Sequence, residues 1–523
     1  MVADVSEEDG AAEPVDESAT NEGDESAPDA SAGSASGSGS QSGRAAPGRV
    51  SGFARADAWV RAHPGAVALA LFFVALAPRL WVSLTWAHEP VWDGHYYHFG
   101  AERIAEGRGY SDEHMGAHGL EWHPWCHYPV GYSGFLAAFY VVFGAKPAVA
   151  VVAQALVLAA TASAVQQLAL TFLSHRRALL AGLVVALHPG LIVYSALVMT
   201  EPLAGLGLVV APLVFKRLER RPLVATITGG LVLGLTTLVQ PQTILVAPAL
   251  ALLAKSASWK RKVGLGALAL AASLVVVLPW TARNCARMDG CAFVSTNGGW
   301  NLAIGASPHA TGRFTALHAA DGCTVVTGQV QQDQCWRDRG ITWIREDPVR
   351  WLSLAPEKLS YTFDHQSFAV GYLEQADPAA WPDARREWWR ELLGTTQYVL
   401  ILFAALGAVR VPRGRLRDAA MAFAGGLALV LFADGVLSEP KRVWPLALAL
   451  PFLTLVPPLG RASRGVIGFI AWVLATFLLI RVVFFGEDRY QIVITPLLIV
   501  LAAAGFRFTV KEDGARRMVR SRP

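Results

Sequence analysis

An acidic residue, Asp93, opens an aromatic and histidine-rich stretch that runs from residue 92 to residue 110. His95, Tyr96 and Tyr97 follow it closely. A carboxylate in this setting can act as a general base that takes a proton from an acceptor hydroxyl. Asp is also a common helix cap, and tyrosines are common at membrane interfaces, so a structural interpretation stays open beside the chemical one.

A second acidic residue, Glu201, lies between two apolar runs in the sequence LVMTEPLAG. A charge at the boundary of a membrane span needs a physical reason. Pro202 is favoured in the first turn of a helix, and an acid there is stabilised by the helix dipole. We therefore expect Glu201 to begin a helix, a role that is compatible with binding substrate.

Two arginines stand near the ends of apolar runs. Arg283 and Asn284 end the run in LPWTARN, and Arg489 and Tyr490 precede the last run in GEDRYQI. Arginine can hold a phosphate through two parallel hydrogen bonds, or it can reach lipid headgroups from the interface. Asn297, in the sequence NGGW, is by itself only a turn signal.

Seven of the thirteen histidines lie between residues 88 and 127. Histidine and carboxylate are metal ligands, so a divalent-cation site that uses Asp93 stays open as an alternative. The chain has no HExxH motif, and surface histidines are the favoured interpretation. We assign no metal ligand and no certain cofactor. Walker and GxGxxG motifs are also absent, which argues against a nucleotide-driven enzyme.

The composition is that of an integral membrane protein. Of 523 residues, 53% are hydrophobic and 16% are charged, and the mean hydropathy is +0.37. Soluble domains contain about 25% charged residues. The net charge is +4, but the charged residues are segregated along the chain rather than spread over it. Nothing in the sequence indicates a nucleic-acid partner.

Apolar runs of spanning or nearly spanning length predict an all-α polytopic fold with about twelve transmembrane helices. The runs cover residues 64–86, 147–171, 178–198, 201–215, 223–240, 243–254, 263–281, 395–409, 418–436, 442–459, 465–485 and 491–506. Residues 341–363 read instead as amphipathic helices on the membrane surface, broken at Pro348 and Pro356.

The stretch 128–144 could be a further span, and the loop charges argue against it. If it does not cross, five loops on the side of the amino terminus carry sixteen Lys or Arg, against three in four short loops opposite. If it does cross, the positive-inside rule is inverted from there on. We therefore predict an interfacial or re-entrant helix, both termini in the cytoplasm, and Asp93, Glu201 and the loop 282–394 on the outer face.

All five cysteines fall on that outer face. Four of them, Cys285, Cys291, Cys323 and Cys335, lie at short spacings that suit disulfides, although sequence does not give the pairing. Cys126 is left over.

These features divide the chain into five parts. They are a disordered, acidic, Ser/Gly-rich cytoplasmic tail (1–60), a transmembrane catalytic module (61–281) with a first outer loop (87–146), a large outer loop (282–394), C-terminal transmembrane helices (395–506) and a basic cytoplasmic tail (507–523).

As an ordered set, these pieces resemble the GT-C fold polytopic glycosyltransferases related to protein O-mannosyltransferases and lipid A aminoarabinose transferases. The resemblance covers residues 64 to 506. Its residues are Asp93, Tyr96, Tyr97, Ala101, 107–110, 129–132, 143–144, 188–189, 194–195, 200–201, 279–280, 283–284, 295–299, 301–302, 310–312, 489–490 and Pro496. Two features depart from it: Gly94 stands where a second acid is common, and Arg442 is an unaligned extra candidate.

The resemblance implies a function. A sugar passes, with inversion, from a polyprenyl-phosphate-linked donor to a hydroxyl of a glycan, lipid or protein acceptor, on the outer face of the cytoplasmic membrane. It implies that Asp93 is the general base and Glu201 the second acid of the site. It implies substrate-binding roles for His95, Tyr96, Tyr97, Arg283, Asn284, Asn297, Arg489 and Tyr490. Juxtamembrane helices and membrane lipids are expected around the site.

A transporter or flippase of lipid-linked sugars is the alternative. It should carry ionisable groups or broken helices at the bilayer midplane and two matching halves. The long loop 282–394 breaks such symmetry. An inactive scaffold with the same fold is the third interpretation.

Overall fold

The computed structural model describes residues 52–116, 119–254, 257–408, 415–438, 440–455 and 464–505. Residues 1–51, most of the predicted acidic tail, and residues 506–523, which include the predicted basic tail, lie outside this part. The described chain begins with helix α1 (Gly52–Ala62).

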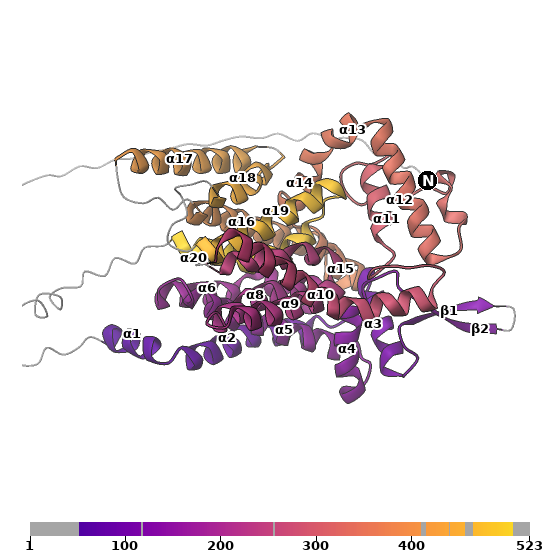
Figure 1. The fold of residues 1–523 in the computed structure, drawn as a ribbon, viewed down its shortest axis with the longest axis horizontal. Helices are drawn as coiled ribbons and strands as arrows, with labels where there is room; N and C mark the ends of the chain where they lie inside the picture. The colour runs from indigo at the N-terminus through magenta and orange to yellow at the C-terminus, as the bar shows by residue number, and fades with distance from the viewer. Residues whose placement is uncertain are drawn as a thin grey trace, which may run out of the picture. The chain divides into compact units, whose positions relative to one another are not determined.

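The described chain is a bundle of helices that run side by side (Figure 1). Seven helices are long and apolar enough to cross a membrane, or eight if one bent pair counts as a span. The seven are α2 (Pro64–Thr85), α5 (Pro147–Leu170), α9 (Pro222–Val239), α10 (Trp259–Arg287), α16 (Asp383–Ala408), α19 (Arg464–Val483; the span itself is Gly465–Val483), and α20 (Gln491–Gly505) together with the short helix before it, as the span Asp488–Gly505.

The other predicted runs form the bent pair and four further helices outside that set of seven. These are α6 (His175–Leu187) with α7 (Pro189–Val193), then α8 (Glu201–Arg217), η2 (Pro241–Leu253), α17 (Arg415–Leu437) and α18 (Trp444–Leu455). Each of the twelve predicted runs is thus mainly helical over its described residues, which confirms the all-α polytopic fold. The stretch predicted not to cross contains the 14-residue helix α4 (Val130–Phe143). At 1.5 Å per residue, a helix of this length is shorter than the ~30 Å hydrocarbon core of a bilayer.

The bent pair has a local cause. Pro189 cannot continue the hydrogen bonding of α6, and α6 and the segment after it meet at an angle of 51°. Arg79, on α2 and fully buried, donates hydrogen bonds of 2.7 Å to the carbonyl groups of Val185 and Ala186 at the end of α6. A buried guanidinium therefore satisfies carbonyls that the break leaves without helical partners.

Helix η2 is a 3₁₀-helix of 13 residues that contains Pro248. Runs of 3₁₀-helix longer than three or four residues are uncommon, because their hydrogen bonds are poorly aligned. Trp472 of α19 supports this one by donating its indole N–H to the Leu245 carbonyl at 2.9 Å.

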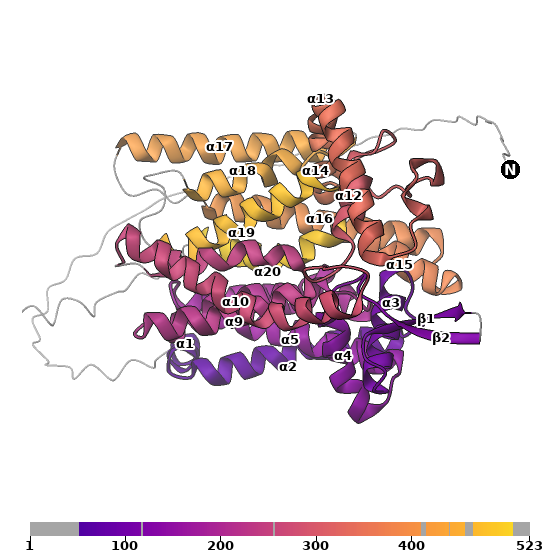
Figure 2. The same cartoon turned by 45° about the vertical axis from the view of Figure 1, so that its right-hand side comes forward.

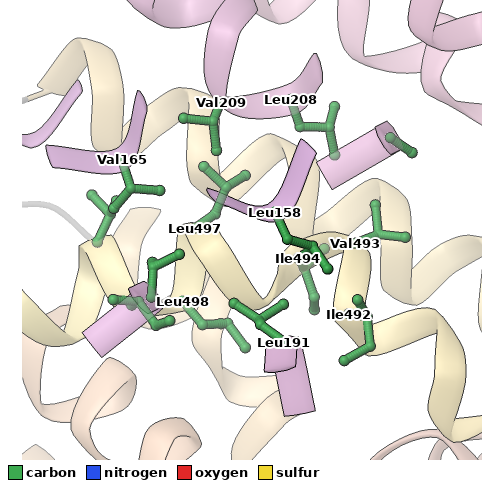
Figure 3. Packing of buried hydrophobic residues seen from close by; sticks show 14 of the residues in the cluster. Leu158, Val165, Leu191, Leu208, Val209, Ile492, Val493, Ile494, Leu497 and Leu498 are labelled. Carbon is green, nitrogen blue, oxygen red and sulfur yellow. The ribbon is translucent and has the colours of Figure 1, made fainter. Parts of the chain in front are cut away.

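Helix α20 lies in the core of the bundle, and each residue from Gln491 to Ala504 is buried. A helix that is apolar on all sides buries every face. Figure 3 shows its packing against α5, α7 and α8. The labelled residues are Leu158, Val165, Leu191, Leu208, Val209, Ile492, Val493, Ile494, Leu497 and Leu498. The short helix η6 (Asp488–Tyr490), directly before α20, is thereby held at one end of the core.

Apart from α1, most elements that do not span lie at that same end of the bundle, called the loop end below (Figures 1 and 2). They are α3 (Asp93–Ala105), the hairpin of β1 (Ser111–Gly116) and β2 (Gly119–Pro124), α4, α11 (Gly298–Ala306), α12 (Gln329–Glu346), α13 (Pro348–Ser353), α14 (Ala355–Phe363) and α15 (Phe368–Ala376). The two strands are antiparallel, with Ser111 opposite Pro124. The predicted break at Pro348 is confirmed, since α12 ends at Glu346 and α13 begins at Pro348.

The predicted disulfides are also confirmed, and the structure supplies their pairing. Cys285 is bonded to Cys291, and Cys323 to Cys335, both at the loop end. Cys126 is a free thiol and is buried.

Candidate active site

Asp93 is the first residue of α3, and its carboxylate is bound by side chains rather than by the helix backbone. Oδ1 accepts a hydrogen bond from the Tyr128 hydroxyl at 2.7 Å, and Oδ2 accepts one from Nη1 of Arg489 at 2.5 Å. Trp92, the N-cap, has a φ of 50°, a strained value for a bulky residue. Such strain costs ~1–3 kcal/mol and is concentrated at functional sites. Because the Asp93 carboxylate binds Tyr128 and Arg489, it does not serve as a simple helix cap.

Arg489 contacts acidic residues from distant parts of the chain. Its Nε lies 3.1 Å from Glu487 Oε2 and 3.9 Å from Glu201 Oε1, in addition to its contact with Asp93. These four residues are called the acid–arginine cluster below. The Arg489 side chain is only 13% exposed, so water screens these charges weakly. The cluster joins the first loop, the start of α8 and the start of α20.

Glu201 begins α8, as the sequence predicts, and is 2% exposed. The Thr200 hydroxyl hydrogen-bonds to Glu201 Oε2 at 3.4 Å, and Gln240 Nε2 donates to Thr200 Oγ1 at 3.2 Å. A helix start favours an acidic group. The helix start and the contact with Arg489 therefore coincide at Glu201.

The protonation states around Asp93 follow from its neighbours. Burial alone would raise the pKa of Asp93, but the Arg489 charge and the hydrogen bonds from Arg489 and Tyr128 outweigh it, so the pKa is lowered. Burial lowers the pKa of His127 to about 4, against the attraction of Asp93. At neutral pH, Asp93 is ionised and His127 is neutral, which is the state that a general base requires.

Aromatic side chains line the approach to Asp93. Tyr96 is 43% exposed and stacks on Tyr128 at 5.3 Å between ring centroids. His95 is exposed beside Tyr96, whereas Tyr97 is 5% exposed and packs in the core. His95 and Tyr96 thus present open surface, and Tyr97 acts as a packing residue. Sequence reasoning missed Tyr128, which ends the sequence WCHY at residues 125–128.

Arg283, Asn284 and Asn297 form no hydrogen bond or ion pair with the cluster in the part of the chain that the structure describes. Arg283 donates to the Tyr110 carbonyl at 2.6 Å and to the Trp125 carbonyl at 3.1 Å. Asn284 Nδ2 donates to the carbonyls of residues 292 and 294. Asn297 accepts from the Ser295 hydroxyl at 2.8 Å. In this structure, Arg283 and Asn284 hold loop backbone in place, and Asn297 holds the Ser295 side chain.

Gly94 explains one departure from the resemblance. A Cβ at this position would collide with the Tyr372 hydroxyl, and it would lie 3.0 Å from the Val198 carbonyl oxygen. A second acid after Asp93 therefore has no room. The extra candidate Arg442 is exposed.

Arg481, at the end of α19, lies beside the cluster through Tyr490, and the sequence analysis did not single it out. It is 5% exposed, and its guanidinium lies 3.9 Å from the centroid of the Tyr490 ring, which also faces Arg489 at 5.0 Å. No carboxylate among the described residues forms an ion pair with it. Arg481 lines a pocket together with Leu208, Gln240, Gln242, Thr243, Val246, Val473, Thr476, Phe477, Ile480, Val493 and Ile494.

Within the described ranges, no group of three or more His, Cys, Asp or Glu residues is arranged to hold a metal ion. The divalent-cation alternative therefore gains no support from side-chain geometry.

No protein-family model and no curated protein matches this sequence. Among solved structures, the chain is similar to the oligosaccharyltransferase of Archaeoglobus fulgidus in complex with Zn and sulfate (TM-score 0.44, 12% identity, 84% of this chain and 48% of that chain). It is also similar to the oligosaccharyltransferase AglB of that organism with an inhibitory peptide and a dolichol-phosphate (0.37, 14%, 86% and 50%). A third is ArnT of Cupriavidus metallidurans bound to undecaprenyl phosphate (0.34, 15%, 86% and 77%).

The chain spans about half the length of the archaeal enzyme. The solved structures to which the chain is similar thus include an oligosaccharyltransferase and ArnT bound to undecaprenyl phosphate.

Proposed function

We propose that this protein is a membrane glycosyltransferase that moves a sugar from a polyprenyl-phosphate-linked donor to an acceptor hydroxyl. The observation that carries the proposal is the acid–arginine cluster. It holds an ionised carboxylate, Asp93, beside an open aromatic surface at one end of an apolar helical bundle. A base near a lipid phase suits a reaction whose donor is carried by a lipid.

The proposed reaction is one displacement. Asp93 accepts the proton of the acceptor hydroxyl while the acceptor oxygen bonds to the anomeric carbon of the sugar. The bond from that carbon to the phosphate oxygen breaks, and its electron pair leaves with the lipid phosphate. Attack opposite the leaving group inverts the carbon. Cationic side chains stabilise the charge that develops on the phosphate.

Arg481 is the arginine best suited to the departing phosphate. Arg489 already contacts three carboxylates, and Arg283 is occupied by backbone carbonyls, whereas Arg481 has no acidic ion-pair partner in the described chain. The hollow beside Arg481 has a volume of about 30 Å³ in this structure, so it must open before a prenyl chain can pack on its apolar walls, among them Phe477 and Val493. His95 and Tyr96, which are exposed beside Asp93, are proposed to contact the sugar or the acceptor.

We propose that the loop end faces the outside of the cytoplasmic membrane. The excess of Lys and Arg in the opposite loops supports this orientation. Two disulfides at the loop end support it independently, because disulfides persist in oxidising compartments. An outward site has no supply of nucleotide sugars, and this favours a lipid-carried donor.

The broken helix α6–α7 is the observation that favours the alternative, a flippase of lipid-linked sugars, because transporters use such helices at their binding sites. In this chain, however, Arg79 fills the break with hydrogen bonds to carbonyls. The break is thereby explained without a substrate.

The test compares wild type with Asp93→Asn. Each purified protein receives a panel of polyprenyl-phosphate sugars and a cell-envelope extract, and the release of free polyprenyl phosphate is followed. Asp338→Asn, a substitution on the exposed face of α12, is the matched control. General-base catalysis contributes ~10²–10⁴-fold, so we expect a loss of that size in Asp93→Asn only. Equal release by all three proteins, or none with any donor, would refute the proposal.

A further inference from the structure

Residues 194–200 physically connect the two acids of the site. This connecting segment begins with the single-turn helix η1 (Tyr194–Ala196) and leads directly into Glu201. Its Val198 carbonyl lies against Gly94, the neighbour of Asp93. A shift of the connecting segment therefore moves Glu201 relative to Asp93.

The connecting segment lies between two helices, and its carbonyl groups need partners from outside it. Ser83 supplies one for Ser195, and Gln154, on α5 and fully buried, supplies those for three others. Its Nε2 donates to the carbonyls of Tyr194 at 3.3 Å, Leu197 at 2.9 Å and Met199 at 3.1 Å. The two N–H groups of one amide thus serve three carbonyls within six residues.

The other end of the Gln154 amide is fixed as well. Its Oε1 accepts a hydrogen bond from the Tyr132 hydroxyl at 2.8 Å, and Tyr132 is fully buried on α4. The Tyr132 ring packs against Tyr97 of α3, the helix that Asp93 begins. Gln154 is therefore linked to Glu201 through the connecting segment and to the helix of Asp93 through Tyr132.

We infer that Gln154 is a positioning residue that sets the place of Glu201 against Asp93 and Arg489. The expected effect on catalysis rests on the proposed function. The expected position of Glu201 does not depend on it. Glu201 lies 3.9 Å from Arg489, at the limit of an ion pair, so a small movement of the connecting segment makes or breaks that contact. A misplacement of ~1 Å at a reacting site can cost ~10²-fold in rate.

A buried amide in a membrane span must be hydrogen-bonded wherever it lies, so burial alone does not give Gln154 a role. The same helix offers a control for this point. Gln166 is 2% exposed and accepts a hydrogen bond from Gln167 Nε2 at 2.8 Å. It has no hydrogen bond to the connecting segment in the described structure, so Gln166→Leu should change packing and polarity without moving Glu201.

The test uses the full chain with Gln154→Leu, Gln154→Glu and Gln166→Leu. Hydrogen–deuterium exchange is measured on peptides that cover residues 194–204, and kcat and KM are measured from release of polyprenyl phosphate. We expect faster exchange and a fall in kcat of ~10–100-fold for Gln154→Leu, with KM for the donor within twofold. Gln166→Leu should match wild type in both.

Gln154→Glu keeps the size of the side chain and guards against a folding defect in Gln154→Leu. Its carboxyl can donate to a carbonyl only when protonated, so its kcat relative to wild type should rise as the pH falls. Unchanged exchange in Gln154→Leu, or faster exchange with unchanged kcat, would overturn the inference. Faster exchange in a protein whose wild type releases no lipid phosphate would reject the proposed function and still support the positioning of Glu201.

Discussion

Replacing Arg481 with Gln separates substrate binding from stability. The substitution removes a buried cation that lines an apolar pocket and has no acidic ion-pair partner in the described chain. A hydrogen bond to a charged group contributes ~1.5–3 kcal/mol. Loss of one such bond to a lipid phosphate should weaken the binding of polyprenyl phosphate ~10–150-fold.

The free energy of unfolding should change much less than the binding of polyprenyl phosphate in Arg481→Gln. An uncompensated buried charge is costly, so its removal relieves a penalty. The same change removes the stacking on Tyr490, which is worth ~0.5–2 kcal/mol. The two effects oppose each other, and we expect the free energy of unfolding of Arg481→Gln to stay within ~1 kcal/mol of wild type.

The assay is the dissociation constant of polyprenyl phosphate in detergent, measured by intrinsic tryptophan fluorescence, beside a thermal-unfolding curve. Arg481→Lys keeps the charge but loses the planar fork, and it should bind with intermediate affinity. Arg108→Gln, which removes an arginine paired with Glu106 at the loop end of the bundle, is the control. If Arg481→Gln binds within threefold of wild type while its unfolding temperature falls, the role of Arg481 is structural and the reasoning is wrong.

Two further substitutions test the surroundings of Asp93. Tyr128→Phe removes a hydrogen bond that favours the ionised form of Asp93, so the pKa of Asp93 should rise. The acid limb of the kcat–pH profile should then move to higher pH by about one unit, and an unmoved limb would exclude this contribution. Gly94→Ala should clash with Tyr372, cost ~1–3 kcal/mol in a thermal-unfolding assay and lower kcat. Gly134→Ala, where a Cβ meets open space, should have neither effect.

Local patterns in the sequence determined the elements and much of the site. The twelve apolar runs are helices because any segment in lipid must satisfy its own backbone, and helices do so within one run. Pro202 marked the helix start at Glu201, and Asp93 also begins a helix. Disulfides were predictable because the cysteines cluster in one polar region.

Tertiary packing decided which residues meet. Asp93 and Arg489 are 396 positions apart, and no local pattern couples them. They meet because α20 is buried on every side and fixes the residues at its start. The same packing decided which arginine is free of acidic partners. Arg283 and Arg481 both lie near the end of an apolar helix, so the sequence does not distinguish them. In the folded chain, Arg283 donates hydrogen bonds to backbone carbonyls, whereas Arg481 lines a pocket.

Gly94 also shows the difference between what the sequence determines and what tertiary packing decides. In the sequence, Gly94 is an unexplained departure from the glycosyltransferase pattern, because a glycine does not show which neighbouring groups need the space. In the structure it is the place where the helix of Asp93 meets the Val198 carbonyl and the Tyr372 hydroxyl. The sequence thus determined the acids and the helices that begin with them, and only the folded chain decided the distances between those acids, because long-range packing sets them.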